Sequence, residues 1–219
     1  MSSTVFAMGA QLGLRERKKR ETRQRISDVA TALFMARGFD NVTVAEVAEA
    51  ADVSKMTVFN YFPRKEELFF DRGEEAEELF SSAIRDRRPG EPVVAAARGM
   101  ALTLLAESHP LSAVWAGFAA FFRVVADSPA LQARAREMAE ELERAIAAVI
   151  AEEVGAGSDD PRPDLVAALI VTTYRTPYLR SARRLLAGED VERVRADHAE
   201  LLNTAFGMLE RAVGNYGVR

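Results

Sequence analysis

The sequence contains no cysteine among its 219 residues and only two histidines. Without cysteine the chain forms no disulfide and has no thiolate to hold a metal ion or attack a substrate, and a cytoplasmic location is the economical interpretation. His109 and His198 lie on separate segments, and no phosphate-binding glycine loop, Gly-x-Ser-x-Gly elbow or metal-ligand spacing is present. These absences argue against an enzyme and predict neither a metal nor a cofactor.

Long apolar runs and strand-like alternation are also missing. No run approaches the roughly 20 apolar residues that span a bilayer, because Arg, Glu, Pro or Gly interrupts each candidate, so we expect no membrane partner. There is no internal repeat and no period-two pattern long enough for a strand. With 48% hydrophobic and 28% charged residues, the chain is long enough for one or two domains. We therefore predict an all-α fold.

Charge is distributed unevenly along the chain. The net charge is -4 overall, but Gly13 to Lys65 holds 11 Lys and Arg against 7 Asp and Glu, a net charge of +4. The basic run Arg15 to Arg25 leads into apolar residues at helical spacing, in a helix that Gly38 should end. This basic end is suited to DNA phosphate, although a solvated, charged helix end has the same pattern.

The segment from Thr43 to Leu68 predicts two short helices joined by a tight turn. Thr43 and Glu46 have the spacing of a capping box, which starts a helix. Asp52 stands where that helix must end, and Asp tolerates a left-handed backbone there better than most residues.

The second short helix should begin after Ser54, whose side chain can cap it. Val58 and Phe59 are expected to point inward, which leaves as outward residues Lys55, Met56, Thr57, Asn60 and Tyr61. A helix-turn-helix places such a helix in the major groove of DNA. An ordinary helical hairpin with solvated polar faces has the same spacing, so spacing alone leaves both interpretations open.

The stretch Val53 to Leu68 resembles the signature of the TetR-type, or tetracycline-repressor-like, transcriptional regulators. In that signature a tyrosine, a phenylalanine and a Lys-Glu-Glu-Leu run lead into the next helix, as they do here. Four residues depart from those usual in the family, namely Asp52, Met56, Phe59 and Arg64. Because Met56 and Phe59 lie on the second helix, they affect the expected operator sequence and not the act of binding.

The resemblance implies a homodimer that binds a pseudo-palindromic double-stranded DNA operator and is released by a small, largely apolar effector. Carried over residue by residue, the resemblance implies that base edges are contacted by Lys55, Met56, Thr57 and Asn60. It implies that phosphates are contacted by Thr43, Tyr61 and Lys65. The stretch Ser128 to Arg134 has a faint resemblance to members that respond to acyl-type or mycofactocin-related ligands.

Beyond Leu68, breaks rich in proline and glycine separate segments of helix length. The predicted helices are Lys65 to Asp86, Val93 to Glu107, Leu111 to Ala126, Pro129 to Val154, Asp164 to Leu186 and Val191 to Asn215, which makes nine with the three before them. Ser128 before Pro129 fits a helix start especially well. We divide the chain into a disordered tail (1–14), a helix-turn-helix DNA-binding domain (15–64) and a helical ligand-binding and dimerisation domain (65–219). The helix beginning near Lys65 should transmit the ligand signal.

Large apolar side chains between residues 100 and 178 mark the expected ligand pocket. They are Met100, Leu104, Trp115, Phe118, Phe121, Phe122, Tyr174 and Tyr178, with possible polar contacts from His109, Arg123 and Arg175. Pro177 removes a backbone hydrogen bond at Thr173 and should kink or open the helix near Tyr174. Plain core packing produces the same aromatic stripe, and His109 can instead cap a helix end.

The last predicted helix has an apolar stripe too wide for a single neighbour. The residues expected at a two-fold interface are His198, Leu201, Leu202, Ala205, Met208 and Leu209, and the resemblance implies a dimer through the last two helices. An internal core helix of a monomer is the alternative.

Three functions compete for this sequence. A ligand-responsive DNA-binding repressor explains both the basic first part and the helical remainder. A helical protein-interaction module leaves the basic part unexplained, and a small helical enzyme lacks the motifs of catalysis.

Overall fold

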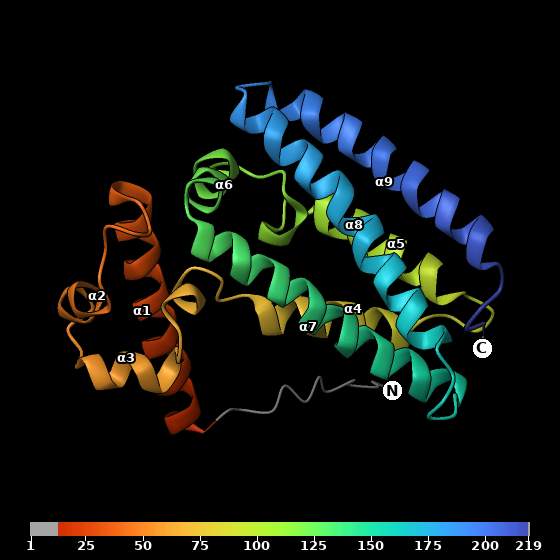
Figure 1. Cartoon of the computed structure of the whole chain (residues 1–219), viewed down its shortest axis with the longest axis horizontal. Coiled ribbons are helices and arrows are strands. Elements are labelled where there is room, and N and C mark those ends of the chain that lie inside the picture. Colours follow the sequence, from red (N-terminus) through yellow and green to blue (C-terminus); the bar gives the residue numbers. More distant parts are fainter. Residues whose placement is uncertain (1–12, 219) are drawn as a thin grey trace, which may run out of the picture. The chain divides into compact units, whose positions relative to one another are not determined.

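Nine α-helices and two short 3-10 helices form the regular structure of residues 13–218, the part of the chain that the computed structural model describes (Figure 1). This part contains no strand, so the predicted all-α fold is confirmed. Residues 1–12, most of the tail expected to be disordered, lie outside the described residues, whereas Leu14 already begins the first helix.

The chain divides into two compact units between Phe69 and Phe70. The elements of the first unit are α1 (Leu14–Arg37), α2 (Val44–Ala50), α3 (Lys55–Tyr61) and the 3-10 helix η1 (Lys65–Leu68). Helix α1 packs against α2 and η1, and α2 packs against α3. The core of this unit is formed by side chains that are almost completely buried: Ile26, Ala30, Phe34, Val47, Val58, Phe62 and Leu68.

The predicted helix from Lys65 to Asp86 is wrong, because the chain breaks it into η1 and a separate helix. The Phe69 N–H donates to the Glu66 carbonyl (3.1 Å), and the Ser27 hydroxyl donates to the Leu68 carbonyl (3.4 Å). These bonds, with the burial of Leu68 and Phe69, fix η1 in the first unit. The first unit therefore extends to Phe69 and does not stop at residue 64.

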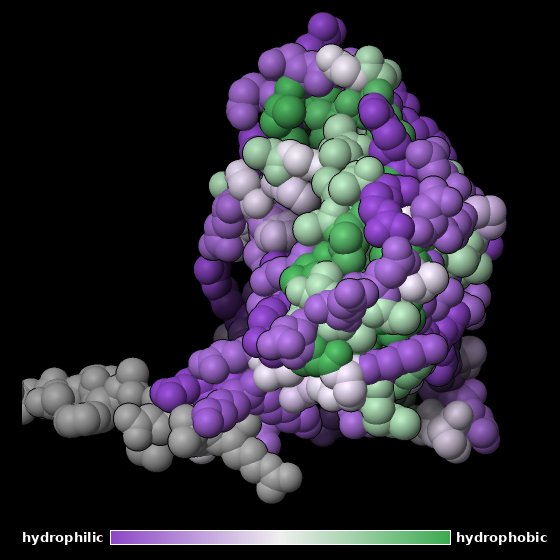
Figure 2. Space-filling view, turned by 90° about the vertical axis from the view of Figure 1, so that its left-hand side faces the viewer, coloured by the Kyte–Doolittle hydropathy of each residue, from purple (hydrophilic) through white to green (hydrophobic). Residues whose placement is uncertain are grey.

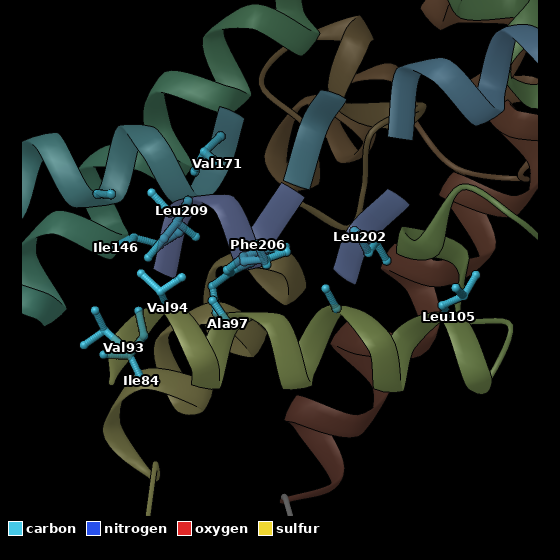
Figure 3. Close-up of a cluster of buried hydrophobic side chains, with 14 of the residues drawn as sticks. Ile84, Val93, Val94, Ala97, Leu105, Ile146, Val171, Leu202, Phe206 and Leu209 are labelled. Carbon is cyan, nitrogen blue, oxygen red and sulfur yellow. The ribbon is translucent and has the colours of Figure 1, made fainter. Parts of the chain in front are cut away.

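The second unit is a bundle of the remaining helices. They are α4 (Gly73–Arg85), α5 (Val93–Ala106), η2 (Pro110–Ser112), α6 (Phe118–Asp127), α7 (Pro129–Val154), α8 (Arg162–Leu186) and α9 (Val191–Val213). Helix α8 packs against both α7 and α9, while α4 packs against α5 and α7, and α5 packs against α9. Figure 3 shows side chains from these helices meeting in one apolar core, among them Ile84, Val94, Ile146, Val171, Leu202 and Phe206.

The predicted helix from Leu111 to Ala126 begins later than expected, at Phe118. Ala113 (φ 64°) and Gly117 (φ 92°) have left-handed backbones that a helix cannot accommodate. The Trp115 indole N–H donates to the Pro110 carbonyl (2.9 Å) and closes the loop. A Cβ at Gly117 would lie 3.1 Å from the indole ring, so glycine suits this position on two grounds.

Two features of the longest helices bear on the sequence predictions. Ser128 caps α7 by accepting from the Leu131 N–H (3.5 Å), with Pro129 in the first turn, as predicted. Helix α8 runs unbroken from Arg162 to Leu186 with Pro177 inside it, so the helix does not open near Tyr174.

Candidate functional site

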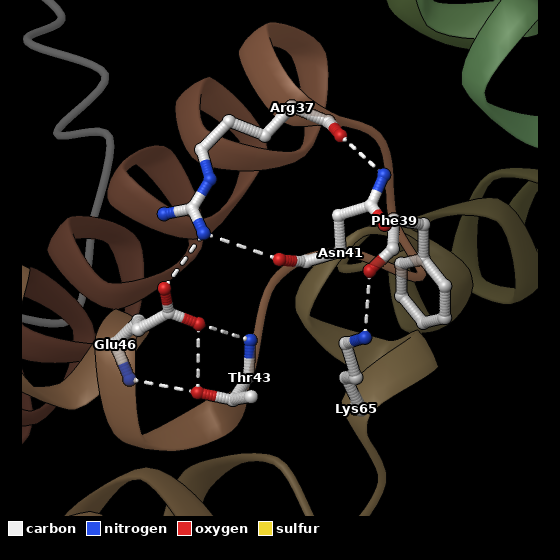
Figure 4. A network of polar contacts seen from close by, with 6 residues as sticks. All are labelled: Arg37, Phe39, Asn41, Thr43, Glu46 and Lys65. Atoms are coloured by element: carbon white, nitrogen blue, oxygen red, sulfur yellow. Dashed lines mark hydrogen bonds and ion pairs between the residues drawn. The ribbon is translucent and has the colours of Figure 1, made fainter.

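The start of α2 is fixed by the predicted capping box. The Glu46 carboxylate accepts from the Thr43 N–H and hydroxyl (2.8 Å each), and the Glu46 N–H donates to the Thr43 hydroxyl (3.3 Å). Arg37 at the end of α1 donates to the same carboxylate (2.7 Å) and to the Asn41 carbonyl (3.2 Å), as Figure 4 shows. These hydrogen bonds lower the pKa of Glu46 to about 2. The network joins the end of α1 to the start of α2.

The turn and the start of α3 also match the sequence prediction. Asp52 has a left-handed backbone (φ 51°). The Ser54 hydroxyl accepts from the Thr57 N–H (3.0 Å) and lies 2.8 Å from the Thr57 hydroxyl. Helix α3 is thus capped by a side chain on the turn that precedes it.

The outward face of α3 differs from the prediction at Phe59, which was expected to point inward. Val58 is completely buried and Phe62 almost so, and these two residues, four apart, define the inward side. Phe59 is 40% exposed and Met56 is 69% exposed. The space-filling view in Figure 2 shows hydrophobic residues, in green, among hydrophilic ones, in purple.

The other α3 residues that the sequence analysis places on the outward side are exposed or half-buried. Lys55 and Asn60 are exposed, while Thr57 and Tyr61 are half-buried. The Lys55 ammonium lies 5.8 Å from the centre of the Phe59 ring. The exposed face of α3 therefore combines a cation, an amide and two large apolar groups.

Two predicted phosphate contacts are engaged within the first unit. The Lys65 ammonium donates to the Phe39 carbonyl (2.6 Å) and lies 4.1 Å from the centre of the Phe39 ring (Figure 4). Burial lowers the pKa of Lys65. The Thr43 hydroxyl is occupied by Glu46, so both side chains stabilise the loop and helix start in this structure.

Basic side chains of α1 supply the positive charge of the first unit. Lys18, Lys19 and Arg20 are exposed, whereas the Arg23 guanidinium lies 4.7 Å from the centre of the Phe62 ring. Arg17 forms only an exposed pair with Glu21 (3.5 Å), and such pairs contribute little. Three consecutive cations on α1 are therefore available to an anionic partner.

The second unit contains an apolar cavity of about 180 Å³ between α4, α7 and α8. Its lining residues are Gly73, Ala76, Glu77, Ala135, Met138, Ala139, Glu141, Leu142, Val171, Tyr174, Arg175 and Tyr178. Two of the predicted pocket residues, Tyr174 and Tyr178, line this cavity, and so does one of the predicted polar contacts, Arg175. Most of the remaining lining residues lie on α4 and α7, and no sequence pattern distinguishes them from residues of ordinary helix contacts.

The other predicted pocket residues lie outside the lining of this cavity, and most of them belong to or pack against the core of the second unit. Phe118 is completely buried, with ring centres of Trp115, Phe122 and Tyr178 at 5.8, 5.9 and 5.4 Å. Leu104 is buried, and Met100 is partly buried against the same core. Aromatic rings at this spacing pack against one another.

His109 and Arg123 also lie outside the cavity lining. The Leu111 N–H donates to His109 Nδ1 (3.3 Å), so His109 caps η2, as the alternative interpretation held. His109 Nε2 lies 3.3 Å from the Glu75 carboxylate. Arg123 is exposed.

Tyr174 connects the cavity to the loop before α6. Its hydroxyl donates to the Leu111 carbonyl (2.5 Å), and its ring meets the Phe80 ring edge-on at 5.3 Å. Burial raises the pKa of both Tyr174 and Tyr178, so both phenols stay protonated. One side chain therefore contacts both the cavity and the backbone of η2.

The predicted interface residues of α9 separate into two sides. His198, Leu202 and Leu209 are buried inside the protomer, which corrects their assignment to an interface. His198 Nδ1 lies 2.8 Å from the Ser181 hydroxyl, and burial lowers the pKa of His198 to about 4. Met208 is 60% exposed, whereas Leu201 and Ala205 are half-buried.

No group of three or more His, Asp and Glu within residues 13–218 is placed to hold a metal ion. Across the same range, every helix is too short or too polar to cross a bilayer.

Comparisons with known proteins relate both units to one family. The family model described as "Bacterial regulatory proteins, tetR family" matches residues 26–71, and "MftR C-terminal domain" matches residues 91–214. The HTH-type transcriptional regulator TcmR of Streptomyces glaucescens is 34% identical over 167 residues, 74% of this chain and 74% of TcmR. The HTH-type transcriptional repressor KstR of Rhodococcus jostii RHA1 is 43% identical over 70 residues, 31% of this chain and 32% of KstR.

Solved structures agree in fold. A TetR-family transcriptional regulator from Mesorhizobium loti MAFF303099 has a TM-score of 0.55 at 16% identity, covering 89% of this chain and 98% of its own. Salmonella enterica GusR has a TM-score of 0.52 at 20% identity, and the match covers 87% of this chain and 94% of the GusR chain. With the helix-turn-helix described above, these relationships show that the chain belongs to the TetR family and is a DNA-binding transcriptional regulator.

Proposed function

We propose that the protein is a repressor that binds its operator as a homodimer and is released by a small, largely apolar effector. The observation that supports DNA binding is the exposed face of α3, which the Ser54 cap holds in a unit whose helix α1 carries exposed cations. The proposed place of action is the cytoplasm, where the operator DNA lies. The comparisons concern transcriptional regulators, which favours this function over an interaction module or an enzyme.

In the proposed complex, base edges and phosphates are contacted by different side chains. Lys55, Met56, Thr57 and Asn60 face the bases, since they lie on the exposed or half-exposed side of α3. For the phosphates we retain Tyr61 and add the exposed α1 cations Lys18, Lys19 and Arg20. Thr43 and Lys65 would first have to leave their partners, Glu46 and the Phe39 carbonyl, so we assign them to supporting the site.

The proposed dimer uses one face of α8 and α9. Leu165 and Leu169 on α8 are 61% and 36% exposed, and Met208 on α9 is 60% exposed. The two helices pack along each other, with Ser181 opposite His198. The outward residues follow helical spacing on both helices: Leu165 and Leu169 on α8, and Leu201, Ala205 and Met208 on α9. A second copy is the occupant proposed for this face, since the same face on both copies makes a closed two-fold contact.

The proposed effector site is the cavity between α4, α7 and α8. Its walls are mostly apolar, with Arg175 and two glutamates as charged groups. A ligand that displaces the Tyr174 ring would strain its bond to the Leu111 carbonyl. Release requires that the effector bind the DNA-free conformation more tightly than the bound one.

Selection of bound duplexes from a random DNA library tests the DNA function. We expect enrichment of a pseudo-palindrome and an affinity, measured by fluorescence anisotropy, that falls steeply with salt. Failure to enrich any duplex would favour the interaction module.

A thermal-shift screen of small apolar compounds tests the effector site. Compounds that stabilise the wild type should lose this effect in Ala139→Phe, which fills the cavity, and should release operator DNA from the wild type. Compounds that bind the wild type and leave its operator affinity unchanged would contradict an effector role for the cavity.

A further inference from the structure

The exposed side of α3 carries two large apolar side chains that the first unit does not bury. Met56 is 69% exposed and Phe59 is 40% exposed. They are three residues apart on a helix and therefore lie side by side on its surface. Lys55 and Asn60, both exposed, border them. An apolar pair at the centre of a DNA-binding face needs an apolar partner.

The major groove of DNA offers one apolar group for direct recognition, the C5-methyl group of thymine. All four bases present hydrogen-bonding atoms in the major groove, thymine through O4, and burying these atoms under a thioether or a phenyl ring leaves them without partners, so an apolar side chain gains most over the thymine methyl group. Methionine is flexible enough to follow a methyl group, while the Phe59 ring offers a flat surface.

The surroundings of the pair favour DNA over a protein partner. Lys18, Lys19 and Arg20 are exposed on α1, and Gly13 to Lys65 has the net charge of +4 derived above. The Lys55 ammonium lies 5.8 Å from the Phe59 ring centre, so the apolar pair and a cation would approach the same surface. Among partners, DNA combines dense negative charge with methyl groups at fixed positions.

We propose that Met56 and Phe59 recognise thymine methyl groups in the operator and so determine part of its sequence. This inference rests on the proposed operator binding. Each side chain covers one methyl group in each half-site, and Lys55 and Asn60 contact the polar edges of neighbouring bases.

The test uses the full-length protein and a duplex selected from a random library. Copies of that duplex, each with one thymine replaced by deoxyuridine, lose a single methyl group and keep every hydrogen-bonding atom. Fluorescence anisotropy should show about four-fold weaker binding at two positions in each half-site, the loss expected for one buried methyl group at each. Met56→Ala should abolish the loss at one of these positions and Phe59→Ala at the other.

Met35→Ala is the matched control, because Met35 is 40% exposed on α1 and lies outside α3. This variant should retain the full sensitivity to deoxyuridine. Circular dichroism melting should show that the variants fold, as expected for exposed side chains.

The outcomes separate this inference from the function on which it rests. Selective binding that is insensitive to every deoxyuridine would overturn the thymine assignment and leave the DNA function standing. If both Met56→Ala and Phe59→Ala keep the full sensitivity to deoxyuridine, other residues contact the methyl groups, and the thymine assignment is also overturned. If no duplex is selected, both proposals fail.

Discussion

The Arg87 guanidinium lies 2.7 Å from the Glu153 carboxylate, and only 1% of the Arg87 side chain is exposed. The guanidinium also donates to the Ile84 carbonyl (2.5 Å) and, through Nε and Nη2, to the Gly217 carbonyl (3.1 and 3.0 Å). One buried cation thus joins the end of α4, helix α7 and the segment after α9.

Glu153→Gln should destabilise the second unit, because it leaves the Arg87 charge buried without its counter-ion. The expected loss in the free energy of unfolding is about 3 kcal/mol, measured by urea denaturation. Glu210→Gln is the matched control, since the Arg98–Glu210 pair (3.2 Å) is about one-third exposed and should cost less than about 1 kcal/mol. Equal losses would show that burial of Arg87 does not determine the effect.

Stability should fall with acidification because of His198. Its pKa is lowered by burial from 6.5 to about 4 in the folded protein, so below pH 6.5 the unfolded chain binds a proton that the folded chain excludes. The stabilisation is fully present above pH 6.5 and is lost as the pH falls towards 4, with an upper limit of about 3 kcal/mol. Urea denaturation at pH 7.5 and pH 5 should show a smaller difference for His198→Gln than for the wild type. An unchanged difference would point to another titrating group.

Thr43→Val should destabilise the first unit by removing the cap of α2. The hydroxyl that accepts from the Glu46 N–H is lost, and the expected cost is about 1 kcal/mol. Thr43→Ser keeps the hydroxyl and should remain within a few tenths of a kcal/mol of the wild type. Thermal melting followed by circular dichroism compares the two; similar losses in both would argue against the cap as the cause.

Lys65→Met should lower stability without changing the salt dependence of DNA binding. The Phe39 carbonyl loses its donor and the Phe39 ring loses its cation, at a cost of about 1–2 kcal/mol. Lys19→Met, at an exposed site on α1, should do the reverse and reduce the slope of log affinity against log salt by about 0.9. If Lys65→Met also reduces the slope of log affinity against log salt, Lys65 contacts a phosphate, as the resemblance implied.

Met208→Asp should convert the proposed dimer to a monomer, since a charge on the outward face of α9 would be buried against its symmetry mate. Analytical ultracentrifugation at micromolar concentration measures the change. Met35→Asp places the same charge at another exposed methionine and should leave the dimer intact. A dimeric Met208→Asp protein would locate the interface elsewhere.

The features that sequence predicted well depend on short-range chemistry. The capping box of Thr43 and Glu46, the left-handed Asp52 and the Ser128 cap each involve residues within three positions of one another, or the backbone of one residue. Such contacts do not require knowledge of what packs nearby.

The features that sequence missed depend on which neighbour covers a side chain. The sequence places Phe59 on the inward side of α3 with Val58, but Phe62 occupies that side. Gly73 and Met138 line the cavity because α4 and α7 meet there, which no local pattern reveals. Likewise, His198 and Met208 belong to one apolar stripe in the sequence, and only packing of α8 against α9 separates them.

The position of η1 has a practical consequence for recombining this protein with its relatives. Leu68 is completely buried and the Phe69 ring lies 6.0 Å from the Phe34 ring, so both complete the core of the first unit. A chimaera that crosses over after residue 64 would transplant a module with part of its interior missing. Crossing over between Phe69 and Phe70 keeps each module's interior intact and is the junction we recommend for coupling a new operator specificity to this sensor.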